Sequence, residues 1–278
     1  MRLDFWKMQG LGNDFMVFDA PHEFCGRPVD AALLRRLADR HTGVGFDQAL
    51  MFEPARDAPV SVDYRIFNAD GGEVEQCGNG ARCVAALVHA RRPELCRELT
   101  MHSPGGPVRA RILEDGRVSV EMGVPNFDPK SLPMDAAQES PLYRLQVDGR
   151  EVRVGAVSMG NPHAVLQVED VGGAPVAQLG PLIERHPAFP RRANVGFMQV
   201  HGRSRISLRV FERGVGETLA CGTGACAAVA VGRRLGLLDA QVDVDLRGGR
   251  AQVSWPGPDR PLWLTGPAVV VFTGSIEL

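Results

Sequence analysis

Two cysteines have the surroundings of reactive thiols. Cys77 opens the run C-G-N-G and Cys221 opens C-G-T-G. Glycine close to a structural cysteine would weaken its packing, whereas glycine close to a reactive thiol lets backbone amides approach a substrate. The sequence therefore favours chemistry at these two positions. The other cysteines are expected to be small hydrophobic residues, the usual role of cysteine in an alanine-rich helix; they are Cys25, Cys83, Cys96 and Cys226.

The spacing of the cysteines argues against a metal site or a redox pair. Cys77 and Cys83 are separated by five residues and Cys221 and Cys226 by four. Structural zinc sites typically use C-x2-C or H-x3-H spacing, and a disulfide redox pair typically uses C-x-x-C. We therefore expect no metal.

The two reactive cysteines occupy equivalent positions in an internal repeat. Arg65 to Ala81 and Arg209 to Ala225 align without a gap over 17 positions, of which 8 are identical. Both cysteines and the glycines that follow them are among the identical pairs. This agreement indicates a duplication with an offset of 144 residues.

Each copy of the repeat has the pattern of a strand, a loop and a helix. Tyr64 to Phe67 and Leu208 to Phe211 are β-branched and aromatic runs followed by glycine-rich turns, and alanine and valine then recur at helical spacing. Each cysteine is therefore predicted to lie at a helix N-terminus, where free N–H groups and the helix dipole favour an anion. This environment is expected to lower the thiol pKa from about 8.5 to between about 3.5 and 7.5.

The duplication predicts an α+β fold of two pseudo-symmetric domains, each a β-rich half-barrel wrapped around a central helix, with the active site in the cleft between them. The domains are expected at residues 1–121 and 122–266, with the last strand, 267–278, crossing back to the first domain. Gly123 to Gln138 changes to Pro, Asp, Ser and Ala, which indicates a linker between the halves. Val29 to Arg40 and Pro175 to Glu184 are predicted to be further helices.

Composition sets limits on partners and location. The 278 residues are 44% hydrophobic and 23% charged, with a net charge of −2, and give no reason to expect a nucleic-acid or membrane partner. The N-terminal segment carries acidic and basic residues where a signal peptide would be apolar, and no apolar run approaches about 18 residues. We therefore expect a cytoplasmic protein.

Asparagine-containing turns also repeat. G-L-G-N-D-F at Gly10 to Phe15 resembles a dinucleotide-binding fingerprint, but Phe15 occupies the third glycine position and no helix is predicted to follow, so we reject that interpretation. Asn161 lies 148 residues after Asn13, nearly the offset of the cysteines. Both asparagines thus belong to the duplication, which favours a ligand role for them over ordinary turn chemistry.

Two thiols brought to opposite faces of one carbon could remove a proton on one side and return one on the other. That is racemisation or epimerisation, and a group with a pKa near the operating pH suits both roles. Backbone N–H groups of Gly78-Asn79 and Gly222-Thr223 would bind a substrate carboxylate. The chain has two lysines, Lys7 and Lys130, and both lie outside the motifs, so no pyridoxal-type cofactor is expected.

With these motifs the chain resembles the diaminopimelate epimerase family over essentially its whole length. The matching segments are G-L-G-N-D-F at 10–15, G-F-D-Q at 45–48, F-N-A-D-G near Asn68, C-G-N-G-A-R-C at 77–83, M-G-N-P-H at 159–163, A-N-V-G-F at 193–197 and F-E-R-G-V-G-E-T-L-A-C-G-T-G-A at 211–225. The resemblance implies a cofactor-independent isomerase that converts LL-2,6-diaminopimelate to the meso form, in lysine and peptidoglycan precursor biosynthesis. It implies that Cys77 and Cys221 are the thiolate/thiol pair.

The resemblance also implies a set of substrate-binding residues: Asn13, Gln48, Asn68, Gly78, Asn79, Asn161, Asn194, Glu212, Arg213, Gly222 and Thr223. Arg213 can pair bidentately with the distal carboxylate, and Glu212 can accept from an ammonium. His163 and Glu212 would tune the pKa of the thiols.

A homodimer is also implied, with one departure from the family pattern. Many members have a tyrosine in the last strand that supports the dimer, and this chain has Phe272 instead. Three alternatives remain open: a proline-type racemase, whose two cysteines have different surrounding motifs; an isomerase that uses a carboxylate; and a non-catalytic binder, which would need neither thiol. Oxidation of Cys77 and Cys221 to a reversible disulfide is a further prediction.

Overall fold

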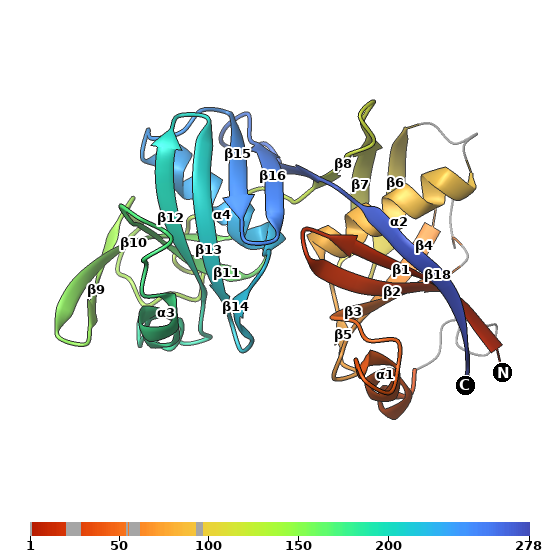
Figure 1. The fold of residues 1–278 in the computed structure, drawn as a ribbon. Coiled ribbons are helices and arrows are strands. Elements are labelled where there is room, and N and C mark those ends of the chain that lie inside the picture. Colours follow the sequence, from red (N-terminus) through yellow and green to blue (C-terminus); the bar gives the residue numbers. More distant parts are fainter. Residues whose placement is uncertain (1, 21–28, 54, 56–61, 93–96) are drawn as a thin grey trace. The chain divides into compact units, whose positions relative to one another are not determined.

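The computed structural model describes the chain except for residues 1, 21–28, 54, 56–61 and 93–96 (Figure 1). Cys25 and Cys96 lie outside the described residues. The chain divides into two compact units, one formed by Met1–Val120 with Thr265–Leu278 and the other by Glu121–Leu264.

Among its described residues, the first unit contains two helices and a set of mostly antiparallel strands. In chain order these are β1 (Arg2–Gly10), β2 (Asn13–Asp19), α1 (Ala31–Ala38), β3 (Gln48–Glu53), β4 (Val62–Asn68), β5 (Glu73–Val74), α2 (Gly78–Arg91), β6 (Glu98–Ser103), β7 (Gly106–Ile112), β8 (Val118–Glu121) and finally β18 (Val269–Glu277).

The second unit has the same plan. Its elements are β9 (Tyr143–Val147), β10 (Arg150–Ser158), β11 (Pro162–Gln167), α3 (Val176–Glu184), β12 (Asn194–Gly202), β13 (Arg205–Glu212), β14 (Gly216–Thr218), α4 (Gly222–Arg234), β15 (Gln241–Leu246) and β16 (Gly249–Ser254). The strand β17 (Trp263–Gly266) spans the boundary, with its last two residues in the first unit.

Strand pairing repeats from one unit to the other. β2 pairs parallel with β3 as β11 does with β12, and β4 pairs parallel with β6 as β13 does with β15. The antiparallel pairs β1–β2, β3–β4, β4–β5 and β6–β7 match β10–β11, β12–β13, β13–β14 and β15–β16. The duplication inferred from short motifs therefore extends to these six strand pairings of each unit.

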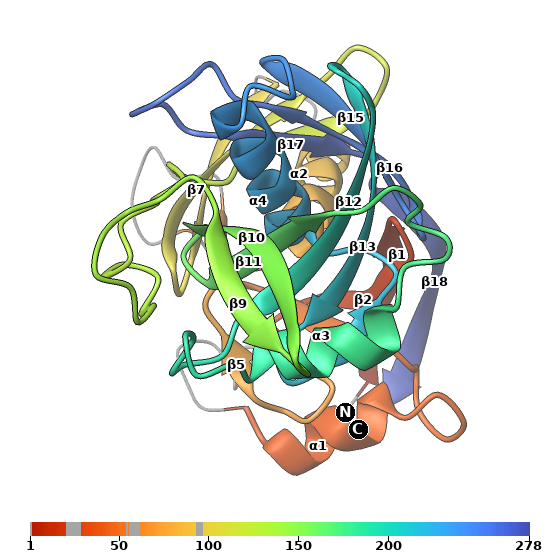
Figure 2. The same ribbon diagram turned by 90° about the vertical axis from the view of Figure 1, so that its left-hand side faces the viewer.

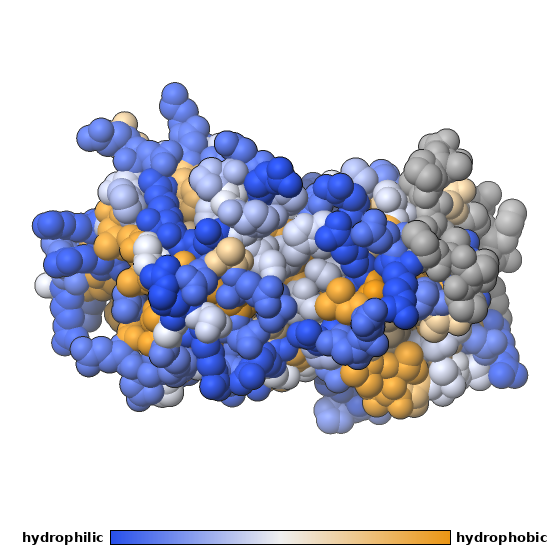
Figure 3. Space-filling view, turned by 90° about the horizontal axis from the view of Figure 1, so that it is seen from above, coloured by the Kyte–Doolittle hydropathy of each residue, from blue (hydrophilic) through white to orange (hydrophobic). Residues whose placement is uncertain are grey.

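The last strand occupies in the first unit the position that β9 occupies in the second. β18 pairs antiparallel with β1, and β9 pairs antiparallel with β10, the counterpart of β1 (Figure 1). Four consecutive β18 residues, Val269 to Phe272, are between 42% and 56% exposed. Apolar side chains also reach the surface in patches between hydrophilic ones on the face that Figure 3 shows.

Each unit wraps its strands around one helix, so the predicted half-barrel is confirmed. α2 packs against β1, β2, β3 and β7 (Figure 1), and α4 packs against β10, β11, β12, β13 and β16 (Figure 2). Ala225, Ala227, Ala228 and Ala230 are fully buried on α4, because small side chains let a helix lie close to a surrounding sheet. Gly155 of β10 is one such close approach, since a Cβ there would lie 2.3 Å from Val231 Cγ1.

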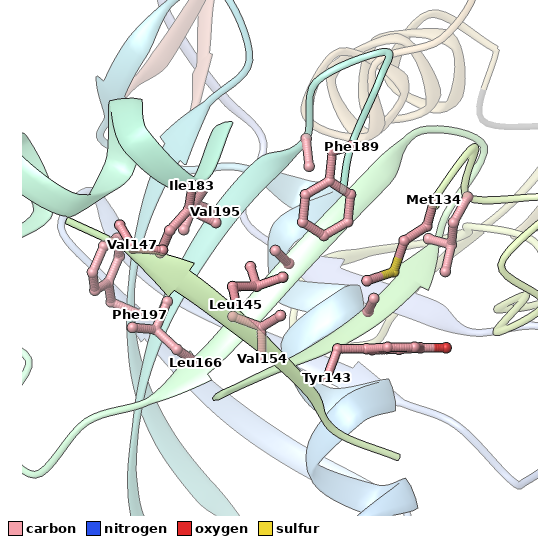
Figure 4. Packing of buried hydrophobic residues seen from close by; sticks show 14 of the residues in the cluster. Met134, Tyr143, Leu145, Val147, Val154, Leu166, Ile183, Phe189, Val195 and Phe197 are labelled. Atoms are coloured by element: carbon pink, nitrogen blue, oxygen red, sulfur yellow. The ribbon is translucent and has the colours of Figure 1, made fainter. Parts of the chain in front are cut away.

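The segment predicted to be a linker is instead part of the second unit. Leu132 and Met134 are 1% and 8% exposed and belong to the hydrophobic core that also contains Tyr143 and Phe189 (Figure 4). Asn126 forms a β-bridge with Ser158. The linker interpretation was wrong because this segment, although rich in Pro, Asp and Ser, also contains two apolar side chains that are buried in the core of the second unit.

Candidate active site

Both reactive cysteines begin the central helices of their units. Cys77 is the N-cap of α2 and Cys221 the N-cap of α4, each with an extended backbone, as the sequence predicted. Each Sγ accepts a hydrogen bond from the N–H group three residues later, that of Gly80 or Gly224, at 3.4 Å in both cases. The thiols therefore satisfy helix N–H groups that would otherwise lack an acceptor.

Cys221 lies in a buried site beside a carboxylate. It is 5% exposed, and its Sγ is 3.6 Å from Thr223 Oγ1. Burial, followed by the charge of Glu212, raises the pKa of the Cys221 thiol well above its ordinary value. The sequence-based expectation of a lowered pKa is wrong for this thiol, because desolvation and a neighbouring negative charge outweigh the helix N–H groups. Glu212 itself accepts from Thr218 Oγ1 at 2.5 Å.

Cys77 lies in a more open site among amides. It is partly exposed, and its Sγ donates to Asn13 Oδ1 at 3.9 Å. Asn79 Nδ2 donates to the same oxygen at 3.4 Å. The first thiol thus contacts a neutral amide, whereas the second thiol has a carboxylate beside it.

A network of charged side chains contacts Asn13 through Asp47. Asp47 Oδ2 accepts from Asn13 Nδ2 at 2.9 Å and from the Asp14 N–H at 3.2 Å. Arg40 reaches both carboxylates, with Nη2 at 2.8 Å from Asp14 Oδ1 and 2.8 Å from Asp47 Oδ1. Lys7 donates to Asp14 and to the Gly45 carbonyl.

Two further pairs of candidate residues occupy matching strand positions. Gln48 of β3 donates from Nε2 to Asn68 Oδ1 of β4 at 2.9 Å. In the second unit Val195 faces Phe211 across β12 and β13, and the next residues along this ladder are Asn194 and Glu212. Where the first unit has the two amides Gln48 and Asn68, the second unit therefore has the amide Asn194 and the carboxylate Glu212.

His163 lies next to Asn161 in the second unit. Its Nε2 is 2.9 Å from Asn161 Oδ1, and Asn161 Nδ2 donates to Thr223 Oγ1 at 3.4 Å. Burial, followed by the charge of Arg213, lowers the pKa of His163 to about 3. The imidazole is therefore neutral at physiological pH and can serve as donor or acceptor through its two tautomers.

The turn that carries Arg213 is fixed through its backbone. The Arg213 N–H donates to Asn194 Oδ1 at 3.0 Å, and Asn194 Nδ2 donates to the Pro162 carbonyl at 3.1 Å. The next N–H, of Gly214, donates at 2.8 Å to Oε1 of Glu184, a residue that is 1% exposed. A buried carboxylate with a backbone partner holds such a turn in one conformation.

The structure thus brings the predicted residues together in two groups, one in each unit. The first group is Asn13, Gln48, Asn68, Cys77, Gly78 and Asn79, and the second is Asn161, His163, Asn194, Glu212, Arg213, Cys221, Gly222 and Thr223.

Sequence reasoning missed three residues that support these groups. Asp47 directly precedes Gln48 in G-F-D-Q, which was a usable signal. Glu184 is the last residue of a predicted helix, and Thr218 aligns with a different residue, Val74, in the other copy of the repeat. Neither position therefore carried a signal in the sequence.

Two general features of the described residues bear on the chemistry. Within the described part of the chain, no group of three or more His, Cys, Asp or Glu side chains is arranged to hold a metal ion. No helix among the described residues is long and apolar enough to cross a membrane.

Comparison with known proteins gives one consistent family. The family model for diaminopimelate epimerase matches residues 5–127 and 155–271. The chain is 53% identical over 279 residues to the diaminopimelate epimerase of Nitrosomonas eutropha, with 100% of both chains covered. It is 54% identical over 282 residues to that of Thioalkalivibrio sulfidiphilus, again with 100% of both chains covered.

More distant solved structures share the fold. A probable proline racemase from Agrobacterium radiobacter superposes with a TM-score of 0.71 at 17% identity, covering 99% of this chain and 93% of the other. A phenazine biosynthesis protein of the PhzF family from Bacillus anthracis superposes with a TM-score of 0.66 at 15% identity, covering 100% of both chains. At such identities the likeness concerns the fold alone.

Proposed function

The chain belongs to the diaminopimelate epimerase family and is an epimerase, and from this premise we propose that Cys77 and Cys221 are its acid–base pair. One thiolate removes the α-proton of LL-2,6-diaminopimelate, and the thiol on the opposite face returns a proton to give the meso isomer. The observation that carries the proposal is the equivalent placement of two thiols at the N-termini of α2 and α4. The reaction serves lysine and peptidoglycan precursor biosynthesis.

The surroundings of Cys221 suggest which thiol is protonated before substrate binds. Burial and Glu212 raise its pKa well above the ordinary value, so Cys221 carries its proton at rest. Cys221 is then the acid in the first half-reaction, and Cys77 the base. The reverse direction exchanges these roles, as a two-base mechanism requires.

Backbone N–H groups supply the electrostatic stabilisation. The developing negative charge on the substrate carboxylate is met by the N-termini of α2 and α4, at Gly78-Asn79 and Gly222-Thr223. No cofactor is needed to accept electrons in this scheme. Exclusion of water from the site strengthens these interactions.

Polar side chains of both units bind the two charged ends of the substrate. Arg213, whose turn is fixed by Asn194 and Glu184, pairs with the distal carboxylate. Glu212 accepts from an ammonium, and the remaining contacts come from the amides Asn13, Gln48, Asn68, Asn79, Asn161 and Asn194 with the hydroxyl of Thr223.

Proton NMR of LL-diaminopimelate in heavy water tests the proposal. We expect the protein without added cofactor to remove the α-proton signal and form the meso isomer. Cys77→Ala and Cys221→Ala should each lower the rate by a factor of about 10² to 10⁴, the usual contribution of a general acid or base. No exchange by freshly reduced protein would overturn the proposal, and proline would then be tested as substrate.

We further propose a cytoplasmic homodimer that buries the outer surface of β18. The exposed run Val269 to Phe272 supports this, because a strand with so much exposed apolar surface favours association. Phe272 packs edge to face on Phe5, with ring centroids 6.1 Å apart. Size-exclusion chromatography with light scattering should give a dimer for the parent and a monomer for Val271→Lys. A monomeric parent at micromolar concentration would rule the dimer out.

A further inference from the structure

The Asn13 amide is held in one orientation by a group that can only accept hydrogen bonds. An asparagine side chain has a donor end and an acceptor end of nearly the same shape, so its neighbours decide which end faces a site. Asp47 Oδ2 is 2.9 Å from Asn13 Nδ2. Since an ionised carboxylate has no proton to donate, the amide nitrogen must face Asp47, and the amide oxygen must face the other way.

Asp47, whose side chain is 44% exposed, is held by hydrogen bonds at both carboxylate oxygens and at its backbone. Its Oδ2 also accepts from the Asp14 N–H, and its Oδ1 accepts from Arg40 Nη2 at 2.8 Å. Its own N–H donates to Asp14, and its carbonyl accepts from the Ala69 N–H at 3.1 Å. The side chains of Lys7, Asp14, Arg40 and Asp47 together carry no net charge, so the network fixes the position of Asp47 without adding a net charge to the site.

We propose that Asp47 is a positioning residue of the active site, which acts through Asn13 by keeping the amide oxygen directed at Cys77. In this orientation Oδ1 accepts from the Cys77 thiol at 3.9 Å and from Asn79 Nδ2 at 3.4 Å. The inference rests on the proposed function for Cys77 and Asn13. Asp47 has no place among the substrate contacts that the motifs implied.

The fixed orientation has two consequences for the reaction. The acceptor at Oδ1 favours the protonated form of Cys77 in the free protein, and Cys77 becomes the base when a substrate ammonium takes this oxygen and the thiol loses its proton to solvent. The same oxygen is the group that a substrate α-ammonium needs, whereas a reversed amide would present N–H donors to that cation. Asp47 therefore favours substrate binding as well as the resting protonation state.

Two ionisable groups that interact with Cys77 do not compete with this effect. Tyr64 on β4 and Cys83 on α2 interact with the thiol. Burial raises the pKa of Tyr64 above its ordinary value and that of Cys83 to about 12. Both therefore stay protonated and neutral over the pH range in which Cys77 is titrated.

The test combines alkylation and steady-state kinetics on Asp47→Ala. The rate of Cys77 carboxamidomethylation by iodoacetamide, followed against pH by peptide mass spectrometry, should shift to lower pH by about half a unit, because Asn13 can then turn its N–H group to the thiolate. KM for LL-diaminopimelate should rise about tenfold, with kcat lowered less, because the amide is no longer held for the ammonium. Asp47→Ser provides the same loss should Asp47→Ala not fold.

Three control variants separate this role from a general structural one. Asp47→Asn removes the charge but keeps an acceptor for Asn13, so it should restore most of both effects. Arg40→Gln breaks the ion pair and leaves the Asp47–Asn13 bond, so it should resemble the parent. In an Asn13→Ala background, Asp47→Ala should add nothing, since the residue through which it acts is gone.

The outcomes that overturn the inference are distinct from those that overturn the function. Equal shifts in Asp47→Asn and Asp47→Ala would show a charge effect, and additive shifts in the Asn13→Ala background would show an independent path. Unchanged alkylation and KM in Asp47→Ala would leave Asp47 without a role. Should the parent fail to epimerise diaminopimelate, the proposed function fails, while the alkylation profiles still decide the role of Asp47.

Discussion

The two thiols occupy the same position in equivalent units, yet their surroundings differ. Cys77 is partly exposed and faces Asn13, an amide anchored by an ionised carboxylate. Cys221 is buried and lies beside Glu212, while its neighbouring asparagine, Asn161, contacts a neutral histidine. Duplication has therefore preserved the backbone that caps each helix and changed the charges around each cap.

The two surroundings also differ in whether the asparagine side chain near each thiol can turn. Asp47 can only accept, so Asn13 has one orientation. His163 can change tautomer, so Asn161 can turn without losing its partner. LL-2,6-diaminopimelate carries an ammonium and a carboxylate at each end, so this asymmetry concerns the two thiols that act on the reacting carbon and not the two ends of the substrate.

The largest expected difference lies in thiol reactivity. In the free protein at pH 8, iodoacetamide should modify Cys77 at least about 100-fold faster than Cys221, because the reactive form is the thiolate and burial with Glu212 opposes ionisation of Cys221. Peptide mass spectrometry of a time course measures both rates in one sample. Guanidinium-unfolded protein, in which the two rates should converge, is the control. Equal rates in the folded protein would contradict the contrast drawn between the two sites.

The next largest effect concerns mild acid and the second unit. The pKa of His163 is about 3 in the folded protein, below the ordinary value of 6.5, so the unfolded state binds a proton first as the pH falls. Stability is complete above pH 6.5 and decreases between that pH and about 3, with about 2 kcal/mol lost between pH 7 and pH 5. Urea unfolding at several pH values should show this slope in the parent and not in His163→Gln. The exposed His201 provides a control, since His201→Gln should keep the slope.

Glu212→Gln should make the second site resemble the first. Removal of the charge beside Cys221 lowers the thiol pKa, so alkylation of Cys221 should become about tenfold faster, a shift of about one pKa unit. Glu217→Gln is a matched control, because Glu217 lies on the adjoining strand and pairs with Arg209 at 2.7 Å. An equal gain in both variants would assign the effect to loosening of the hairpin.

The parts of this picture that the sequence predicted share a physical basis. Strand and helix periodicity, and the position of each cysteine before an alanine-rich helix, are local signals. The repeat could be read because duplicated residues remain aligned along the chain. The linker prediction for Gly123 to Gln138 was wrong because composition averages over a segment, whereas burial is decided by single side chains such as Leu132.

Features that depend on contacts distant in sequence could not be predicted in this way. The helix N-terminus predicted a lowered pKa for both cysteines, but desolvation of Cys221 depends on the strands that surround α4. The anchoring of Asn13 joins residues 34 positions apart, and the Glu184 bond to Gly214 joins residues 30 apart. Such bonds leave no periodic trace in a single sequence.

The smallest expected effect tests the charged network that the second unit lacks. The position 148 residues after Asp14 is Pro162, so the second unit has no counterpart of this carboxylate. Burial alone would raise the pKa of Asp14, but hydrogen bonds from Arg40 and Lys7 lower it to about 2. Its stabilisation is therefore present above pH 4 and is lost as the pH falls toward 2.

After allowance for solvent around the half-exposed Arg40, Asp14 should contribute about 1 kcal/mol at pH 5. Asp14→Asn should lower the free energy of unfolding in urea by that amount at pH 5 and by much less at pH 2.5. Asp115→Asn alters an exposed carboxylate held by Arg117 and should change little at either pH. If Asp14→Asn lowers the free energy of unfolding by the same amount at both pH values, then Asp14 stabilises the first unit through packing and not through its charge.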